Sequence, residues 1–144
     1  LFQFKNFQIL ADYAHNPAGF SVLKAYVDKV EATRKIGIIA GTGDRRDDDI
    51  RDLGEIAAKM FDEIIIRQDK HLRGRTEDDI INLLKEGIAR VGKDISVKVI
   101  LKELEAIDYA VQNAPKDSFI VICSDVVTDA LAHIQKLKNE EDTH

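Results

Sequence analysis

The chain has 144 residues, of which 44% are hydrophobic and 33% are charged, and its formal net charge is −5. This length and balance are ordinary for one globular domain and unlike a disordered chain. Positive and negative residues are interspersed, so the sequence offers no basic face for a nucleic-acid backbone, and we expect no nucleic-acid partner.

The sequence also limits metal, disulfide and membrane chemistry. Its single cysteine, Cys123, excludes an intrachain disulfide and a cysteine-based metal cluster, and its apolar surroundings favour a buried thiol. The longest apolar runs, about five residues, are too short for a membrane span, and with no leader-like start we expect a cytoplasmic protein. Because the chain begins at Leu1 without methionine, we expect it to be a part of a longer protein.

Short apolar runs alternate along the chain with helical patterns. The predicted strands are residues 2–5, as an edge strand, and residues 7–13, 36–40, 63–67, 97–101 and 119–123. Apolar residues at three- and four-residue steps predict the helices between them. These stripes are Phe20, Leu23, Val27 and Val30; Ile50, Leu53, Ala57 and Met60; Ile80, Leu84, Ile88 and Val91; Leu104, Ile107 and Val111; and Val127, Leu131 and Ile134.

Local signals mark the ends of several predicted helices. Asn16 precedes proline as a helix cap, and Thr76 with Asp79 approximates a capping box. Gly92 is expected to end a helix, and the charged tail of residues 136–144 is expected to fray.

Strand–helix alternation with short connections predicts an α/β fold. We expect one domain over residues 1–144, with a doubly wound, mostly parallel sheet of about six strands and helices on both faces. Ligands bind outside the carboxyl ends of the strands in such sheets. That rule selects the loops at residues 12–16, 41–49, 68–75 and 124–125.

Two of these loops resemble a known family. The sequence Asp-Tyr-Ala-His-Asn-Pro at residues 12–17 resembles the motif that starts the C-terminal domain of Mur ligases, folylpolyglutamate synthetases and cyanophycin synthetases. The sequence Gly-Thr-Gly-Asp-Arg-Arg-Asp at residues 41–47 is similar to the glycine-rich segment after the second strand of that domain. Its second half, and the Arg-Gly-Arg at residues 73–75, are most similar to cyanophycin synthetases. The resemblance covers residues 1–130.

Two departures bear on the substrate. Peptidoglycan ligases carry a Gly-Lys-Gly-His-Glu-like turn after the last strand, where this chain has Cys-Ser-Asp-Val-Val at residues 123–127. The Asp-Asn-Pro-Arg sequence of the diaminopimelate-adding enzymes is also absent from residues 68–75. Both differences disfavour a peptidoglycan precursor.

The resemblance implies the C-terminal lid of an ATP-dependent amide-bond-forming ligase, inactive by itself. In cyanophycin synthetases, arginine is joined through an acyl phosphate to the aspartate side-chain carboxyl of a poly-aspartate backbone. This chain has no Gly-x-x-x-x-Gly-Lys-Ser/Thr sequence, so we expect a P-loop central domain of the same parent chain to hold most of the ATP and Mg²⁺. The parent is expected to be a homo-oligomer that binds an amino acid and a carboxylate.

The resemblance places Asp12, His15 and Asn16 beside ATP when the lid closes. Asp12, at a strand end, could accept hydrogen bonds from ribose hydroxyls or order water. The alternatives are a turn for Asp12, a satisfied loop histidine for His15 and a helix cap for Asn16, which is compatible with nucleotide contact.

The expected substrate contacts are arginines and one aspartate. Arg45 and Arg46 are charged forks suited to carboxylates or phosphates, although the aspartates that follow could simply pair with them. Arg73 could clamp the α-carboxylate of an amino acid, Asp69 could face a guanidinium, and Arg75 completes this loop. A solvated charged loop is the alternative.

Two other functions stay open on the sequence alone. One is a Mur or folylpolyglutamate-type ligase domain, which the two departures disfavour. The other is a stand-alone, non-catalytic binding module with the same fold, which the negative charge and polar loops do not exclude.

Overall fold

A computed structural model describes residues 1–14, 16–41, 46–67, 76–124 and 128–143. The strands in this part of the chain are β1 (Phe2–Gln3), β2 (Phe7–Asp12), β3 (Lys35–Ile39), β4 (Glu63–Ile66), β5 (Ser96–Val99) and β6 (Ser118–Cys123). The helices are α1 (Pro17–Val27), α2 (Asp47–Met60), α3 (Glu77–Ala89), α4 (Glu103–Asn113) and α5 (Thr128–Asp142).

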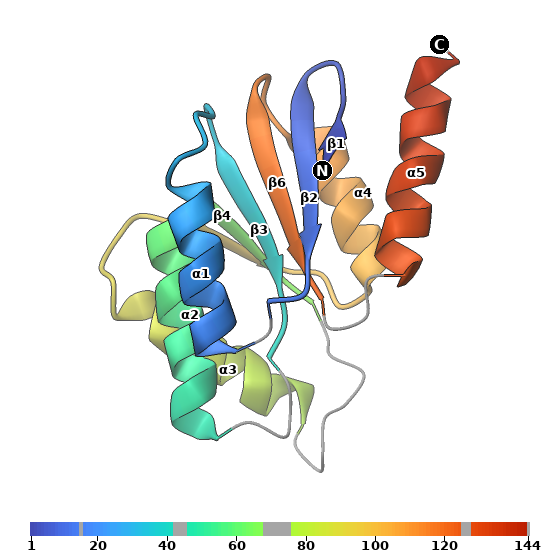
Figure 1. Ribbon diagram of the computed structural model, residues 1–144. Coiled ribbons are helices and arrows are strands. Elements are labelled where there is room, and N and C mark those ends of the chain that lie inside the picture. Colours follow the sequence, from blue (N-terminus) through green and yellow to red (C-terminus); the bar gives the residue numbers. More distant parts are fainter. Residues whose placement is uncertain (15, 42–45, 68–75, 125–127, 144) are drawn as a thin grey trace.

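The strands form one sheet in the order β1-β2-β6-β3-β4-β5 (Figure 1). The β1 strand pairs antiparallel with β2, and all other pairs are parallel. The last strand in sequence therefore lies between β2 and β3. The parallel strands all end at one edge of the sheet, the lower edge in Figure 1, which we call the carboxyl edge.

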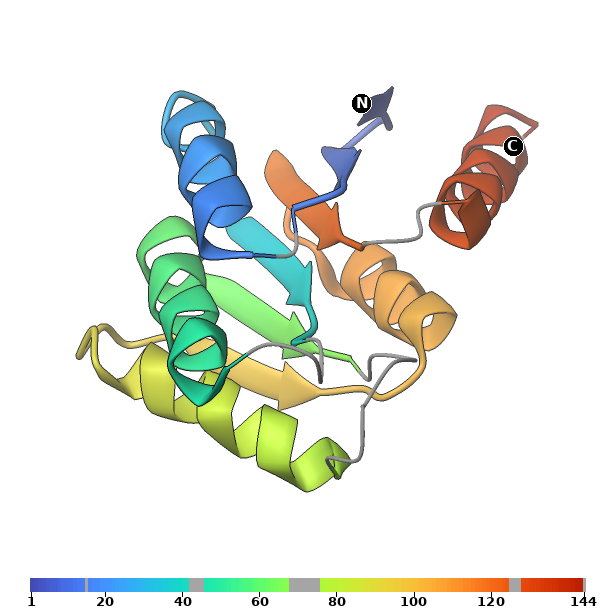
Figure 2. The same cartoon turned by 60° about the horizontal axis from the view of Figure 1, so that its bottom comes forward.

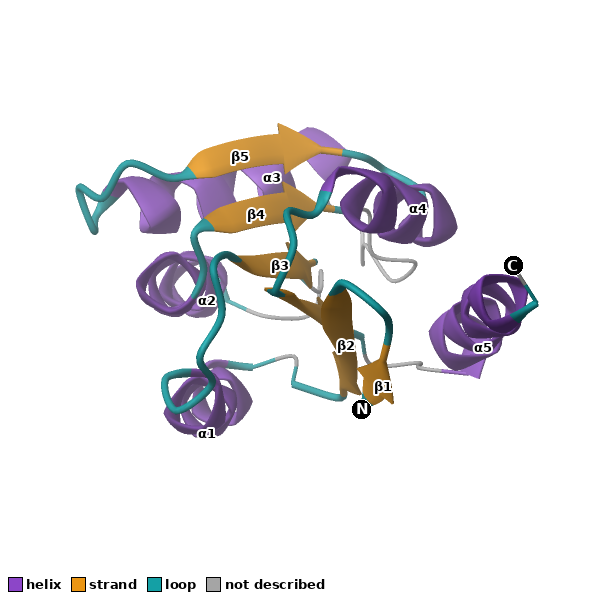
Figure 3. Ribbon diagram, turned by 90° about the horizontal axis from the view of Figure 1, so that it is seen from above, coloured by secondary structure: helices purple, strands orange, loops and turns teal. Residues whose placement is uncertain are grey.

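Helices cover both faces of the sheet. Helices α1, α2 and α3 lie on one face, and α4 and α5 lie on the other (Figures 2 and 3). All six residues of β6 are buried, and they alternate between the two cores because strand side chains alternate in direction. Phe119, Val121 and Cys123 join the core under α1–α3, whereas Ile120 and Ile122 join the core under α4 and α5. The predicted doubly wound α/β fold is confirmed.

The predicted strands and most caps are also confirmed, with ends shifted by one or two residues. The Asn16 side chain accepts a hydrogen bond from the Gly19 amide at 2.7 Å and caps α1. Thr76 and Asp79 form the predicted capping box of α3. Gly92, just beyond α3, has the positive φ of 68° that glycine adopts readily.

The predicted apolar stripes of α4 and α5 are partly wrong. Leu104 is 42% exposed and Leu131 is 39% exposed. The buried residues of α4 are Ala106, Ile107 and Ala110, and those of α5 are Ala130 and Ile134. Small alanines face the sheet here, and a stripe predicted from large apolar side chains misses them. Val127, the first residue of the predicted α5 stripe, lies outside the described residues.

The tail expected to fray is instead helical as far as Asp142. The Lys138 side chain pairs with Asp142 at 3.1 Å and lies over the Phe4 ring. Glu141 accepts a hydrogen bond from the Lys5 amide at 3.0 Å. These contacts with the N-terminal segment hold the last turns of α5 against the domain.

Helices α2 and α3 approach each other closely at two glycines. A Cβ atom at Gly87 would overlap the carbonyl oxygen of Arg51, and one at Gly54 would overlap that of Leu84. Both obstacles are backbone atoms, which cannot turn aside as a side chain can. The two helices can pack at this separation only because both positions lack a side chain.

We predict that Gly87→Ala lowers the free energy of unfolding by about 2 kcal/mol, although alanine favours helix more than glycine does, because the added methyl forces α2 and α3 apart. Urea unfolding followed by circular dichroism measures the change. Asn82→Ala, at an exposed position of α3, is the matched control and should not destabilise the protein. A Gly87→Ala protein as stable as the parent would contradict this account of the helix contact.

Candidate functional site

Residues from four strands meet at the carboxyl edge. Asp12 ends β2, Gly41 follows β3, Arg67 follows β4 and Ser124 follows β6. The Ser124 amide donates to the Asp12 carbonyl at 2.9 Å, which extends the β2–β6 pairing beyond the strand ends. The segments that carry the two resemblance motifs therefore lie on the same edge, on either side of β6.

Asp12 is held in a tight turn. One carboxylate oxygen, Oδ2, accepts a hydrogen bond from the Ala14 amide at 3.0 Å. This is the turn role that the sequence left open for Asp12. An ionised carboxylate can accept several hydrogen bonds, so this contact leaves acceptor capacity for a ligand.

Asn16 is the N-cap of α1, and Pro17 is the first residue of that helix. The capped amide lies in the first turn, where backbone N–H groups and the helix dipole favour a nearby negative charge. The cap role of Asn16 is confirmed, and its nucleotide contact stays a prediction. His15 lies outside the described residues.

A hollow of about 620 Å³ lies between β2 and α1. Its lining includes the polar side chains of Asp12 and Asn16 together with Tyr13, Val22 and Tyr26. These three larger side chains are 62%, 75% and 48% exposed, respectively. A concave, largely apolar surface with a few polar groups is typical of small-molecule sites. Tyr13 was not predicted from the sequence as a site residue, although it lies inside the Asp-Tyr-Ala-His-Asn-Pro motif.

Arg46 caps α2 through its backbone and lies on the surface, with its side chain 84% exposed. Its guanidinium contacts Asp49 through Nε at 3.3 Å and Nη2 at 3.2 Å. These hydrogen bonds to Asp49 raise the pKa of Arg46. The pairing with a following aspartate, which the sequence left open, is therefore present. Arg45 lies outside the described residues.

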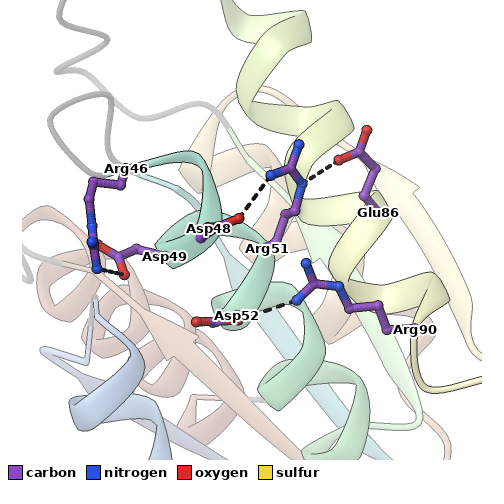
Figure 4. Close-up of polar contacts among 7 residues, drawn as sticks. All are labelled: Arg46, Asp48, Asp49, Arg51, Asp52, Glu86 and Arg90. Carbon is purple, nitrogen blue, oxygen red and sulfur yellow. Dashed lines mark hydrogen bonds and ion pairs between the residues drawn. The ribbon is translucent and has the colours of Figure 1, made fainter.

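Further ion pairs lie within α2 and between α2 and the α3 segment (Figure 4). Arg51 contacts Glu86 at 2.6 Å and Asp48 at 3.1 Å, and Arg90 contacts Asp52 at 3.3 Å. Most of these side chains are substantially exposed, so each pair contributes little to stability alone. These pairs give each of these charged side chains a partner of opposite sign on the facing surfaces of α2 and α3, which we call the α2–α3 seam.

Gly41 serves the packing of the domain. A Cβ at Gly41 would come within 2.8 Å of the Ile80 side chain on α3 and 3.3 Å of Ile50 on α2. The absence of a side chain at Gly41 thus lets the end of β3 pass under these helices. The rest of this loop, residues 42–45, lies outside the described residues.

The third predicted loop also lies outside the described residues, including Asp69, Arg73 and Arg75. Arg67, directly before it, is described and was not selected from the sequence. Its side chain is only 7% exposed, and its Nε lies 3.0 Å from Glu103 Oε2. The sequence signal that could have selected Arg67 is its place directly after the apolar run Ile-Ile-Ile. A charge at the end of a buried strand needs a partner.

Cys123 is buried at the end of β6, as the sequence predicts. Burial, with a smaller effect from Asp12, raises the pKa of the thiol to about 12. Among the described residues, no cluster of three or more histidine, cysteine or acidic side chains could hold a metal ion. None of the helices in this part of the chain is long and apolar enough to cross a membrane.

The fold agrees with the family comparison. Residues 2–126 match the model of the Mur ligase, glutamate ligase domain, and the chain belongs to this family. Among individual proteins, the chain is similar to cyanophycin synthetase from Geminocystis herdmanii, with 40% identity over 136 residues. That match covers 94% of this chain but only 15% of the cyanophycin synthetase.

Solved structures show the same fold. A UDP-N-acetylmuramoyl-L-alanyl-D-glutamate–2,6-diaminopimelate ligase superposes with a TM-score of 0.75 and 17% identity, over 94% of this chain and 31% of that one. E. coli FolC in complex with ADP gives a TM-score of 0.68 and 18% identity, over 99% of this chain and 32% of that one. The family predicted from the sequence motifs is confirmed.

We predict that Cys123 resists alkylation in the folded protein. With a pKa of about 12 the thiol stays protonated at pH 8, and thiolate forms only as the pH rises towards that value. Iodoacetamide labelling at pH 8, followed by mass spectrometry, should be on the order of 100-fold slower in the native protein than in urea. Equal rates in the two states would show that the thiol is neither buried nor perturbed.

Proposed function

We propose that this chain is the C-terminal lid of an ATP-dependent amide-bond-forming ligase of the cyanophycin synthetase type. The main support is the common carboxyl edge, where the ends of β2 and β3, at Asp12 and Gly41, lie on either side of β6. The family membership and the 40% identity to a protein named cyanophycin synthetase support the choice of ligase.

The proposed reaction begins when a substrate carboxylate oxygen attacks the γ-phosphorus of ATP, releasing ADP and forming an acyl phosphate. The amine of an incoming amino acid then attacks the acyl carbon. The tetrahedral intermediate collapses with loss of phosphate and of the amine proton, leaving an amide. In the cyanophycin synthetase type, the carboxylate is an aspartate side chain of a poly-aspartate backbone and the amine belongs to arginine.

The proposed role of the lid is to close over the site where the acyl phosphate forms. An acyl phosphate is easily hydrolysed, so a closing domain that excludes water and positions the amine favours amide formation. The P-loop and Mg²⁺ site are proposed to lie in a central domain of the parent chain. Location in the cytoplasm and assembly of the parent into a homo-oligomer stay predictions.

On the nucleotide side we propose Asp12, His15 and Asn16 as contacts, with Tyr13 added from the structure. The hollow beside β2 combines an exposed aromatic ring with a carboxylate and an amide. The ring suits a nucleotide base, and the Asp12 carboxylate suits ribose hydroxyls. The substrate side comprises Arg45, Arg46, Asp69, Arg73 and Arg75, whose forks suit carboxylates and whose aspartate suits a cationic side chain.

We predict that Asp12→Asn in the full-length protein raises the KM for ATP about tenfold, because the amide oxygen preserves the turn to Ala14 while the charged acceptor is lost. Steady-state kinetics with varied ATP measures the change. Asp62→Asn is the matched control, since Asp62 also accepts a backbone hydrogen bond, from the Lys35 amide, but at the opposite edge of the sheet. An unchanged KM for ATP in Asp12→Asn would remove the nucleotide contact.

We predict that Arg73→Ala raises the KM for the amino acid about tenfold or more and leaves that for ATP within about twofold, because a clamp on the α-carboxylate is lost. Initial rates with arginine varied at saturating ATP provide the measurement. Arg90→Ala is the control, because that guanidinium pairs with Asp52 on the α2–α3 seam. A normal KM for the amino acid in Arg73→Ala would reject the clamp.

A further inference from the structure

Arg67 is a buried cation at the carboxyl edge, with 7% of its side chain exposed. Its amide donates to the Ile39 carbonyl at 2.9 Å, so its backbone extends the β3–β4 pairing by one residue. A buried guanidinium needs polar or charged partners nearby, because burial of a charge without partners is costly. The partners that it reaches therefore indicate its role.

Those partners belong to other elements. Arg67 Nη2 donates to the Cys123 carbonyl at 3.0 Å, at the end of β6. Nε lies 3.0 Å from Glu103 Oε2, in the first turn of α4, which is an ion-pair contact and not a hydrogen bond. Because β3 lies between β4 and β6, the side chain reaches across the end of β3. One side chain thus ties together β4, β6 and α4.

The β6 end is in turn tied to Asp12. Directly after Cys123, the Ser124 amide donates to the Asp12 carbonyl at 2.9 Å, and Ser124 itself is 3% exposed. Two hydrogen bonds and one peptide unit therefore connect the Arg67 guanidinium to the backbone of Asp12. The connection runs along the edge where ligands of doubly wound sheets bind.

Arg34, directly before β3, is a more exposed arginine for comparison with Arg67. Arg34 contacts Glu63, at the amino end of β4, at 3.3 Å, and its side chain is 47% exposed. Apolar residues can often replace buried ion pairs without loss of stability, so stabilisation of the core does not by itself account for the Arg67–Glu103 pair. The hydrogen bond from Arg67 Nη2 also restricts the direction of the Cys123 carbonyl at the end of β6.

We propose that Arg67 is a positioning residue, which with Glu103 fixes the carboxyl end of β6 and, through Ser124, the backbone of the nucleotide-side residue Asp12. This inference rests on the proposed function for its kinetic consequence, but its structural part is independent of that function.

The structural part is tested on the 144-residue chain with Arg67→Lys. Lysine keeps the charge but, as a single ammonium, does not reproduce the guanidinium fork that reaches both partners. We expect hydrogen exchange at the Ser124 amide to become at least about tenfold faster, because the strand end is released. Exchange at the Phe119 amide, bonded to the Arg34 carbonyl at the other end of β6, should not change. A Ser124 exchange rate equal to that of the parent protein would overturn the proposal. Faster exchange at both the Ser124 and Phe119 amides would also overturn it.

The kinetic part uses the full-length protein. Arg67→Lys should raise the KM for ATP about fivefold with the KM for the amino acid unchanged, whereas the control Arg34→Lys should change neither. Glu103→Gln, which keeps the side-chain shape, should raise the KM for ATP by a smaller factor. This variant replaces Arg67→Lys in the test if Arg67→Lys does not fold. Faster Ser124 exchange with no effect of either Arg67→Lys or Asp12→Asn on the KM for ATP would reject the nucleotide-side function while leaving the positioning intact. An effect of Asp12→Asn without one of Arg67→Lys would reject the claim that Arg67 positions Asp12 for ATP binding, whatever the exchange result.

Discussion

The structure depends on the insertion of β6 between β2 and β3. Hydrogen bonds on both sides of β6 align the carboxyl ends of three parallel strands, and its alternating side chains enter both hydrophobic cores. The segment after β2 and the segment after β3 come from the first third of the chain, yet the last strand sets their separation. Any weakening of β6 would therefore affect the carboxyl edge and both cores together.

Polar groups along that edge are held by specific partners. Asp12 accepts from the Ala14 amide, Asn16 caps α1, and Arg67 reaches the end of β6. Fixed groups of this kind lose little conformational entropy when a ligand binds, so they suit a domain that closes over a ligand held mainly elsewhere. Arg46 differs, because it is exposed and, among the described residues, its ion pair is with Asp49 in the first turn of α2. Its partner could be exchanged for a ligand at low cost.

The proposed lid role is consistent with the share of the relatives that this domain covers. It matches 15% of the length of the cyanophycin synthetase from Geminocystis herdmanii. The domain supplies an edge of partnered polar groups and an apolar hollow next to Asp12. Under the proposed function, phosphate chemistry belongs to another part of the parent, and the lid controls water and amine position.

The sequence by itself determined the features that local physics controls. Strand and helix positions follow from the spacing of apolar residues, the caps at Asn16 and Thr76 involve partners three residues away, and the family follows from two contiguous motifs. Only the tertiary structure decided the place of β6, the exposure of Leu104 and the pairing of Arg67 with Glu103. Each of these depends on contacts between segments distant in sequence, and neither periodicity nor capping rules contain information about such contacts.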